Sequence, residues 1–175
     1  MVGGNSEYGE SLAGNTSGNV ELMFNQWMDE KEAFDESGYR ANLESTFYNG
    51  KSIGPYAQIV KAKNSKFGCG FSLCENLPYL YLLICRYEVP NRIGEEVYGQ
   101  PINSNGENIP TSTIKKTTAT IEVTATNTLT LDDSQKETLL SLHREARKAL
   151  NSPNMKDITW DDEIANGAQV WYIYI

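Results

Sequence analysis

The stretch GPYAQIVKAKNSKFGCGFSLCENLPYLYLLICRYEVPNRIGEEVY, residues 54–98, decides the fold. It contains two segments with the composition of β-strands, Lys66–Cys74 and Tyr79–Tyr87. The first alternates apolar with small or polar residues, and the second is rich in aromatic and aliphatic residues. A short break with one proline separates them. Two strands joined by a tight turn predict an antiparallel β-hairpin.

The cysteines of this hairpin indicate a disulfide. If the turn is centred near Leu77, Cys69 lies directly opposite Cys85, and directly opposed antiparallel residues have the Cα separation that a disulfide needs. The alternative is a pair of reduced cysteines in the core of a cytosolic hairpin. The chain has three cysteines, so Cys74 is left over. Three fates remain open for it: a thiol, a bond to a cysteine upstream of this chain, or a disulfide-linked dimer.

The stretch resembles the CAP superfamily, which comprises the cysteine-rich secretory proteins, insect antigen 5 and the plant pathogenesis-related 1 proteins. The first family signature is Gly-His-aromatic-Thr-Gln, two aliphatic residues and Trp. It is matched at residues 54–61, where Tyr56 and Gln58 are in place. Two positions depart from it: the signature histidine is Pro55, and the signature tryptophan is Lys61.

The second signature and the closing motif of the family also have counterparts. An aliphatic pair followed by Cys-x-Tyr occupies residues 83–87 and ends at Tyr87. The closing Ile-Gly-x-x-Val-Tyr occupies residues 93–98. Order and spacing both follow the family.

Two acidic residues upstream match the acids of the family's central cleft. Residues 9–12, Gly-Glu-Ser-Leu, resemble the motif Gly-Glu-Asn-Leu and place Glu10. The next segment, Asn19–Phe34, has apolar residues at helical spacing behind a suitable N-cap. Within it, Trp27 and Glu30 resemble the family's Trp-x-x-Glu. The alternative for Glu30 is one more solvated acid on a charged helix face.

The C-terminal part of the chain contains the clearest predicted helix. It covers residues 130–150, with Ser134 and Glu137 as a capping box and an apolar stripe that includes His143. A short strand at Asp157–Trp160 and a helix at Asp161–Trp171 are expected to follow.

This part resembles the opening of a CAP domain. His143 and Arg147 match His-Asn-x-x-Arg of the first helix, and Trp160 matches the Trp of a later motif. The pieces therefore stand out of order. Residues 1–98 resemble the closing two-thirds of one CAP domain, residues 99–129 are a Thr-rich linker, and residues 130–175 resemble the opening third.

Two accounts of this order remain open. One is a fragment of a tandem two-domain protein, as in the activation-associated secreted proteins of nematodes. The other is a circular permutant, in which the last segment docks onto the first. In either case the resemblance implies an α+β fold. It would be a three-layer α-β-α sandwich with a central antiparallel sheet, incomplete or circularly permuted.

Composition excludes some classes of function. The net charge of −8 and pI near 4.7 lack the basic surface that nucleic acid requires. No apolar run reaches the roughly 18–20 residues of a membrane-spanning helix. The cysteines, the linker and the sequon at Asn15 favour an extracellular, secreted protein. No signal peptide is visible, so we expect the start of the parent protein to be missing.

The cleft motifs predict binding rather than catalysis. In the family, two Glu and two His of the cleft can hold a divalent cation. Glu10 and Glu30 would supply the acids, but both histidines are absent, so we expect no cofactor or at most a weak divalent-cation site. A single helix histidine assembles no catalytic triad. The resemblance implies a lipid, sterol or extracellular-protein ligand, with the polar loop at 35–53 as one place for lipid contact. The alternatives are a metal-dependent hydrolase and a non-functional fragment.

Overall fold

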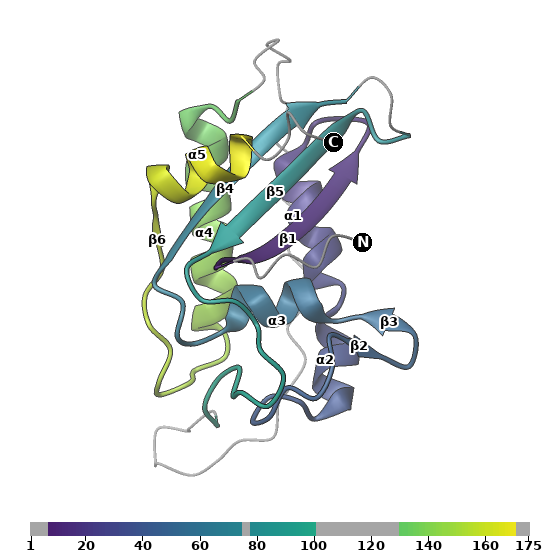
Figure 1. Cartoon of the computed structure of the whole chain (residues 1–175), viewed down its shortest axis with the longest axis vertical. Coiled ribbons are helices and arrows are strands. Elements are labelled where there is room, and N and C mark those ends of the chain that lie inside the picture. The colour runs from purple at the N-terminus through teal and green to yellow at the C-terminus, as the bar shows by residue number, and fades with distance from the viewer. Residues whose placement is uncertain (1–6, 75–77, 101–129, 171–175) are drawn as a thin grey trace.

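The structure is a computed structural model that describes residues 7–74, 78–100 and 130–170 (Figure 1). The helices are α1 Val20–Met28, α2 Lys31–Ser37, α3 Gly54–Val60, α4 Asp133–Lys148 and α5 Asp162–Val170. The strands are β1 Gly9–Asn15, β2 Phe47–Tyr48, β3 Lys51–Ser52, β4 Lys66–Leu73, β5 Tyr81–Tyr87 and β6 Thr159–Trp160. None of the helices described is long and apolar enough to span a bilayer.

The central sheet has the strand order β1-β5-β4-β6. The β4–β5 hairpin has the predicted register, because Cys69 pairs with Cys85 across it. β1 pairs antiparallel with β5, whereas β6 runs parallel to β4. The expected α+β fold is confirmed, but the sheet is mixed rather than wholly antiparallel. Its parallel strand, β6, comes from the C-terminal segment and lies at the edge.

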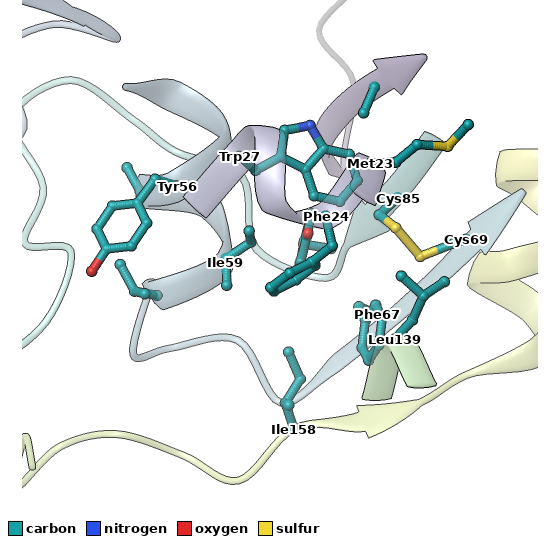
Figure 2. Close-up of a cluster of buried hydrophobic side chains, with 14 of the residues drawn as sticks. Met23, Phe24, Trp27, Tyr56, Ile59, Phe67, Cys69, Cys85, Leu139 and Ile158 are labelled. Atoms are coloured by element: carbon teal, nitrogen blue, oxygen red, sulfur yellow. A yellow bond between two sulfur atoms is a disulfide. The ribbon is translucent and has the colours of Figure 1, made fainter. Parts of the chain in front are cut away.

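The sheet separates two hydrophobic cores. On one face, α1, α3 and α4 pack against alternate residues of β1, β4 and β5, and these elements form the main core. Figure 2 shows aromatic side chains of α1 above the sheet, close to the Cys69–Cys85 disulfide. On the other face α5 covers β4 and β5, with Ala168 packed against Leu82 and Ile84. Within the described residues the fold is therefore a three-layer sandwich whose outer layer is the short helix α5.

Two glycines of β4 let α5 lie directly on the strand. A Cβ atom at Gly68 would come within 2.3 Å of the backbone nitrogen of Ala165. A Cβ atom at Gly70 would come within 2.7 Å of the backbone of Ala168. Gln169 completes the contact by hydrogen bonding to both the N–H and the carbonyl of Phe71. This close approach of backbones explains why β4 carries glycine on its outer face.

The helix ends follow local capping chemistry, with one correction. Asn19 caps α1 by accepting a hydrogen bond from the N–H of Leu22, as predicted. The capping box of α4 is formed by Asp132 and Gln135, not by the predicted Ser134 and Glu137. Both pairs have the spacing of the motif, and the structure selects the one two residues earlier, where the helix begins.

Three segments differ from their sequence-based description. The predicted helix Asn19–Phe34 is two helices, since α1 ends at Met28 and α2 begins at Lys31. The polar loop 35–53 contains the end of α2 and the small β2–β3 hairpin. The predicted strand Asp157–Trp160 is reduced to the two residues of β6. Helix α3 was not predicted. The linker at 99–129 and the end of the last predicted helix lie largely outside the described residues.

Candidate functional site

A cavity of about 390 Å³ opens where β1, the β2–β3 hairpin and the start of α3 meet the loop after β5. Its walls include Glu10 from β1, Phe47 and Ser52 from the hairpin, Pro55 and Gln58 from α3, and Asn91 from the loop. Phe47 is 60% exposed at the cavity. The cavity thus joins apolar surface with a few fixed polar groups, the usual composition of a small-molecule site.

Glu10 is held by an arginine that sequence reasoning did not single out. The Nε and Nη2 atoms of Arg86 both lie 2.8 Å from the same carboxylate oxygen of Glu10. The Nη1 atom donates to the carbonyl of Gly167 on α5. Glu10 and Arg86 are directly opposed in the β1–β5 register, and their ion pair lies on the face of the sheet that α5 covers. Cross-strand register was the signal that could have revealed Arg86.

Glu30 lies behind the cavity rather than in its wall. Its carboxylate accepts a hydrogen bond from the N–H of Tyr56 at 3.0 Å. Burial raises the pKa of Glu30 above its usual value, although the hydrogen bonds from Tyr56 and Ser52 oppose the shift. The Tyr56 ring is buried and packs on Phe34, with ring centroids 5.3 Å apart. Glu30 therefore positions the first turn of α3.

The carboxylates do not fit a divalent-cation site. Glu10 is neutralised by a guanidinium, and Glu30 is committed to a backbone N–H. The signature histidine position holds Pro55, which sits in the first turn of α3, where proline is favoured. Across residues 7–74, 78–100 and 130–170, no cluster of three or more His, Cys, Asp or Glu side chains is placed to hold a metal ion. The weak-cation expectation stays a prediction without support from this geometry.

The other wall of the cavity is a hydrogen-bonded amide pair. Gln58 is buried, donates to the carbonyl of Val89 at 2.7 Å, and accepts the N–H of Asn91 at 2.8 Å. The amide nitrogen of Asn91 donates to the carbonyl of Gly54. The Asn91 side-chain oxygen is buried and has no hydrogen-bond partner among the described residues. A buried acceptor without a donor is costly, so this oxygen is a candidate contact for a ligand that donates.

Lys61, at the signature tryptophan position, is also structural. Its side chain is fully buried, and its Nζ lies 3.0 Å from a carboxylate oxygen of Glu95. The hydrogen bond from Lys61 lowers the pKa of Glu95. The ammonium is thus paired away from the cavity wall.

His143 lies in the main core, remote from the cavity. Its Nδ1 is 2.7 Å from the carbonyl of Leu139, which can only accept, so Nδ1 carries the proton. Nε2 therefore accepts the Tyr87 hydroxyl, 2.9 Å away. Its ring packs against Phe67 and Phe24, at centroid distances of 4.0 and 4.9 Å. Burial lowers the pKa of His143 to about 3, so the imidazole stays neutral.

This shift predicts a pH-dependent stability. Below the unfolded-state pKa of about 6.5, the unfolded chain binds a proton on His143 that the folded chain does not. The free energy of unfolding should fall by about 1.4 kcal/mol for each pH unit as the pH drops from 6.5 towards 3. Urea unfolding across this range measures it. Carboxylates also titrate there, so the expected result is that His143→Gln removes this component of the slope. An identical slope in both proteins would contradict it.

The other residues singled out from the sequence, Trp160, Cys74 and Asn15, make local contacts away from the cavity. Trp160 donates from Nε1 to Asp162 and lies edge-on to Phe67. The Cys74 thiol lies 3.9 Å from the carbonyl of Ser72. The Asn15 side chain accepts the N–H groups of the two residues at 17 and 18, and it donates to the carbonyl at 19. Glycosylation of Asn15 stays a prediction.

Arg147 ties the C-terminal segment to the rest of the chain. Its guanidinium is buried and donates to the carbonyls of Ile59 and Lys61 through Nη1, and to those of Asn64 and Lys156 through Nη2. Each distance is 2.8 or 2.9 Å. Sequence alone placed Arg147 in a helix motif but gave no indication of these partners, because three of them are more than 80 residues away.

Comparisons with known proteins agree with the motifs of the N-terminal part. Residues 1–87 match the model of the family described as CAP, the cysteine-rich secretory protein family. Peptidase inhibitor 16 of Bos taurus is 32% identical over 85 residues, which are 45% of this chain and 17% of that protein. Pathogenesis-related protein 1A1 of Solanum lycopersicum is 33% identical over 104 residues, 57% of this chain and 53% of that protein.

A third relative matches a shorter segment. Cysteine-rich venom protein VAR4 of Varanus acanthurus is 39% identical over 54 residues, 31% of this chain and 32% of that protein. The chain therefore spans between about a sixth and about half of the length of these relatives.

Proposed function

Since the family match and the relatives support a place for this chain in the CAP superfamily, we propose that it is a secreted, non-enzymatic binding protein. The extracellular location is supported by the family's description as secretory and by the Cys69–Cys85 disulfide, a bond that persists in oxidising compartments. The finer resemblance to a tandem two-domain nematode protein stays a proposal.

The ligand that this cavity suits best is an apolar molecule with a terminal hydroxyl, such as a sterol. The observation that carries this proposal is the buried side-chain oxygen of Asn91, which has no donor among the described residues. A hydroxyl group would supply that donor, and the exposed ring of Phe47 with the neighbouring Pro55 and Pro90 would cover part of an apolar body. The polar side chains of the wall are already held by other groups of the chain, Glu10 by Arg86 and Gln58 by the backbone of Val89 and Asn91, and this arrangement supports binding.

A fluorescent sterol titration tests the proposal. Wild-type protein should take up dehydroergosterol saturably, and Phe47→Ala should weaken binding about tenfold, the equivalent of about 1.4 kcal/mol. Ile93→Ala is the matched control, because Ile93 is 63% exposed but does not line the cavity. Its affinity should equal that of wild type. Equal loss in both variants, or no saturable uptake, would refute the cavity as the site.

The same titration, combined with an activity assay, distinguishes a binding protein from a metal-dependent hydrolase. Binding that is unchanged by EDTA agrees with a cation-free cavity. Zn²⁺-dependent turnover of an ester or glycoside that is lost in Glu10→Gln or in Glu30→Gln would instead establish an enzyme and overturn the proposal.

A further inference from the structure

A second cavity, of about 590 Å³, lies at the C-terminal end of α4 and along the loop that leads to β6. Four cationic residues line it: Arg144, Arg147, Lys148 and Lys156. Two carboxylates, those of Glu145 and Asp157, also line it. Four positive and two negative charges leave a local excess of two positive charges, in a chain whose net charge is −8. The cavity is therefore a cationic site on an acidic protein.

The buried member of this set is a cation with no carboxylate in direct contact among the described residues, and Asp157 acts on it only from beyond ion-pair distance. Arg147 is 2% exposed, and no described carboxylate lies within ion-pair distance of its guanidinium. The four carbonyls occupy its Nη atoms, but its Nε–H is buried without a hydrogen-bond partner in the described part of the chain. Burial lowers the pKa of Arg147 only to about 10, so the group is charged at neutral pH. A buried charge of this kind is stabilised by a nearby anion.

The two carboxylates do not neutralise the lysines. Asp157 lies 3.6 Å from Arg144 and accepts the N–H of Ile158. Glu145 accepts the hydroxyl of Ser141 at 3.1 Å. Neither Lys148 nor Lys156 forms an ion pair with a carboxylate of the described residues. Both ammonium groups are exposed and available to an incoming anion.

We propose that this cavity binds a tetrahedral oxyanion, the phosphate or sulfate group of a ligand. Lys148 and Lys156 would supply point charges from the two sides of the cavity, one on α4 and one on the loop. Arg147 would supply the positive potential of its floor. Ammonium groups donate three hydrogen bonds in adaptable directions, which suits the oxygens of such a group. This proposal is independent of the β1–α3 cavity.

Titration with inorganic phosphate and inorganic sulfate tests it, with sodium chloride at matched ionic strength as the reference. Calorimetry should show saturable binding to the wild-type chain, at least tenfold weaker in Lys148→Gln/Lys156→Gln. The control is Lys63→Gln/Lys136→Gln, which makes the same change in net charge away from the cavity and should bind as wild type does. Neither double variant alters a buried residue, so both are expected to fold. The arginine is left intact in these variants because its loss is expected to destabilise the fold.

Three outcomes are decisive. Binding that is lost in the cavity variant and kept in the control supports the site. Equal weakening in both variants, or no saturation with either anion, overturns it. Vesicles of phosphatidylcholine with and without phosphatidic acid then identify the source. Retention on the acidic vesicles that free phosphate competes away assigns a lipid headgroup, and binding of the free anion alone assigns a solute.

Discussion

Replacing Arg147 by methionine is expected to lower the free energy of unfolding by about 4 kcal/mol, the scale of breaking a buried charged network. The substitution keeps most of the side-chain volume but removes the guanidinium. Four backbone carbonyls would then lose the arginine as a donor, although that of Lys61 still accepts the N–H of Asn64. Each buried group left unsatisfied costs about 1–3 kcal/mol before relaxation. Water entering from the adjacent cavity would recover part of this cost. Urea unfolding, followed by tryptophan fluorescence, measures the difference in midpoint.

A lysine at this position distinguishes charge from geometry. Arg147→Lys keeps the positive charge, but one ammonium cannot span carbonyls on both sides of the planar guanidinium. We expect it to recover less than half of the lost stability. Arg144→Met is the matched control, because Arg144 is exposed on the same helix and its loss should change stability by no more than about 0.5 kcal/mol. Equal stability of Arg147→Met and wild type would show that the carbonyl network contributes nothing.

Cutting the chain between Lys115 and Lys116 is expected to leave both pieces in one complex. The structure packs α4, β6 and α5 against elements of residues 7–98, across both faces of the sheet. The disulfide lies wholly within the first piece, so no covalent bond would join the two. Size-exclusion chromatography of the cut protein should give a single peak at the mass of the intact chain. Denaturant should resolve it into two.

A substitution at the glycine contact between β4 and α5 tests whether this contact holds the two pieces together. Gly70→Leu would drive a side chain into the α5 backbone, so the cut protein should separate without denaturant. Glu137→Leu places the same side chain at an exposed position of α4 and should stay associated. Separation of the cut wild-type chain under native conditions would contradict the docking of residues 130–170. It would favour instead a slice of a longer tandem protein, with each piece completing a different domain.

Local sequence patterns predicted hydrogen-bond and disulfide partners well where the two residues are near in sequence. The β4–β5 register followed from the two strand patterns and the turn between them, and with it the pairing of Cys69 with Cys85. The N-cap of α1 followed from one residue type. The capping box of α4 was misplaced by two residues because Asp132-x-x-Gln135 and Ser134-x-x-Glu137 share the same spacing.

Contacts between distant segments could not be read from those patterns. The family motifs supplied Glu10, but only the register of β1 on β5 brings Arg86 to it. The side chains around His143 come from three elements: Phe24 from α1, Phe67 from β4 and Tyr87 from β5. Helix α3 was missed because its seven residues begin with Gly-Pro, which in sequence also reads as a turn. Its helical form depends on burial by the surrounding elements.

The late position of α5 in the sequence has a consequence for how the chain is made. A ribosome delivers β4 and β5 long before α5, since Phe71 and its partner Gln169 are 98 positions apart. During that interval the nascent hairpin can close and oxidise locally, but its outer side, with Leu82 and Ile84, has no cover. Translation adds about 5–20 residues per second, so this interval lasts several seconds. The uncovered hairpin is then the stage at which a chaperone or a neighbouring nascent chain competes with α5 for the same surface.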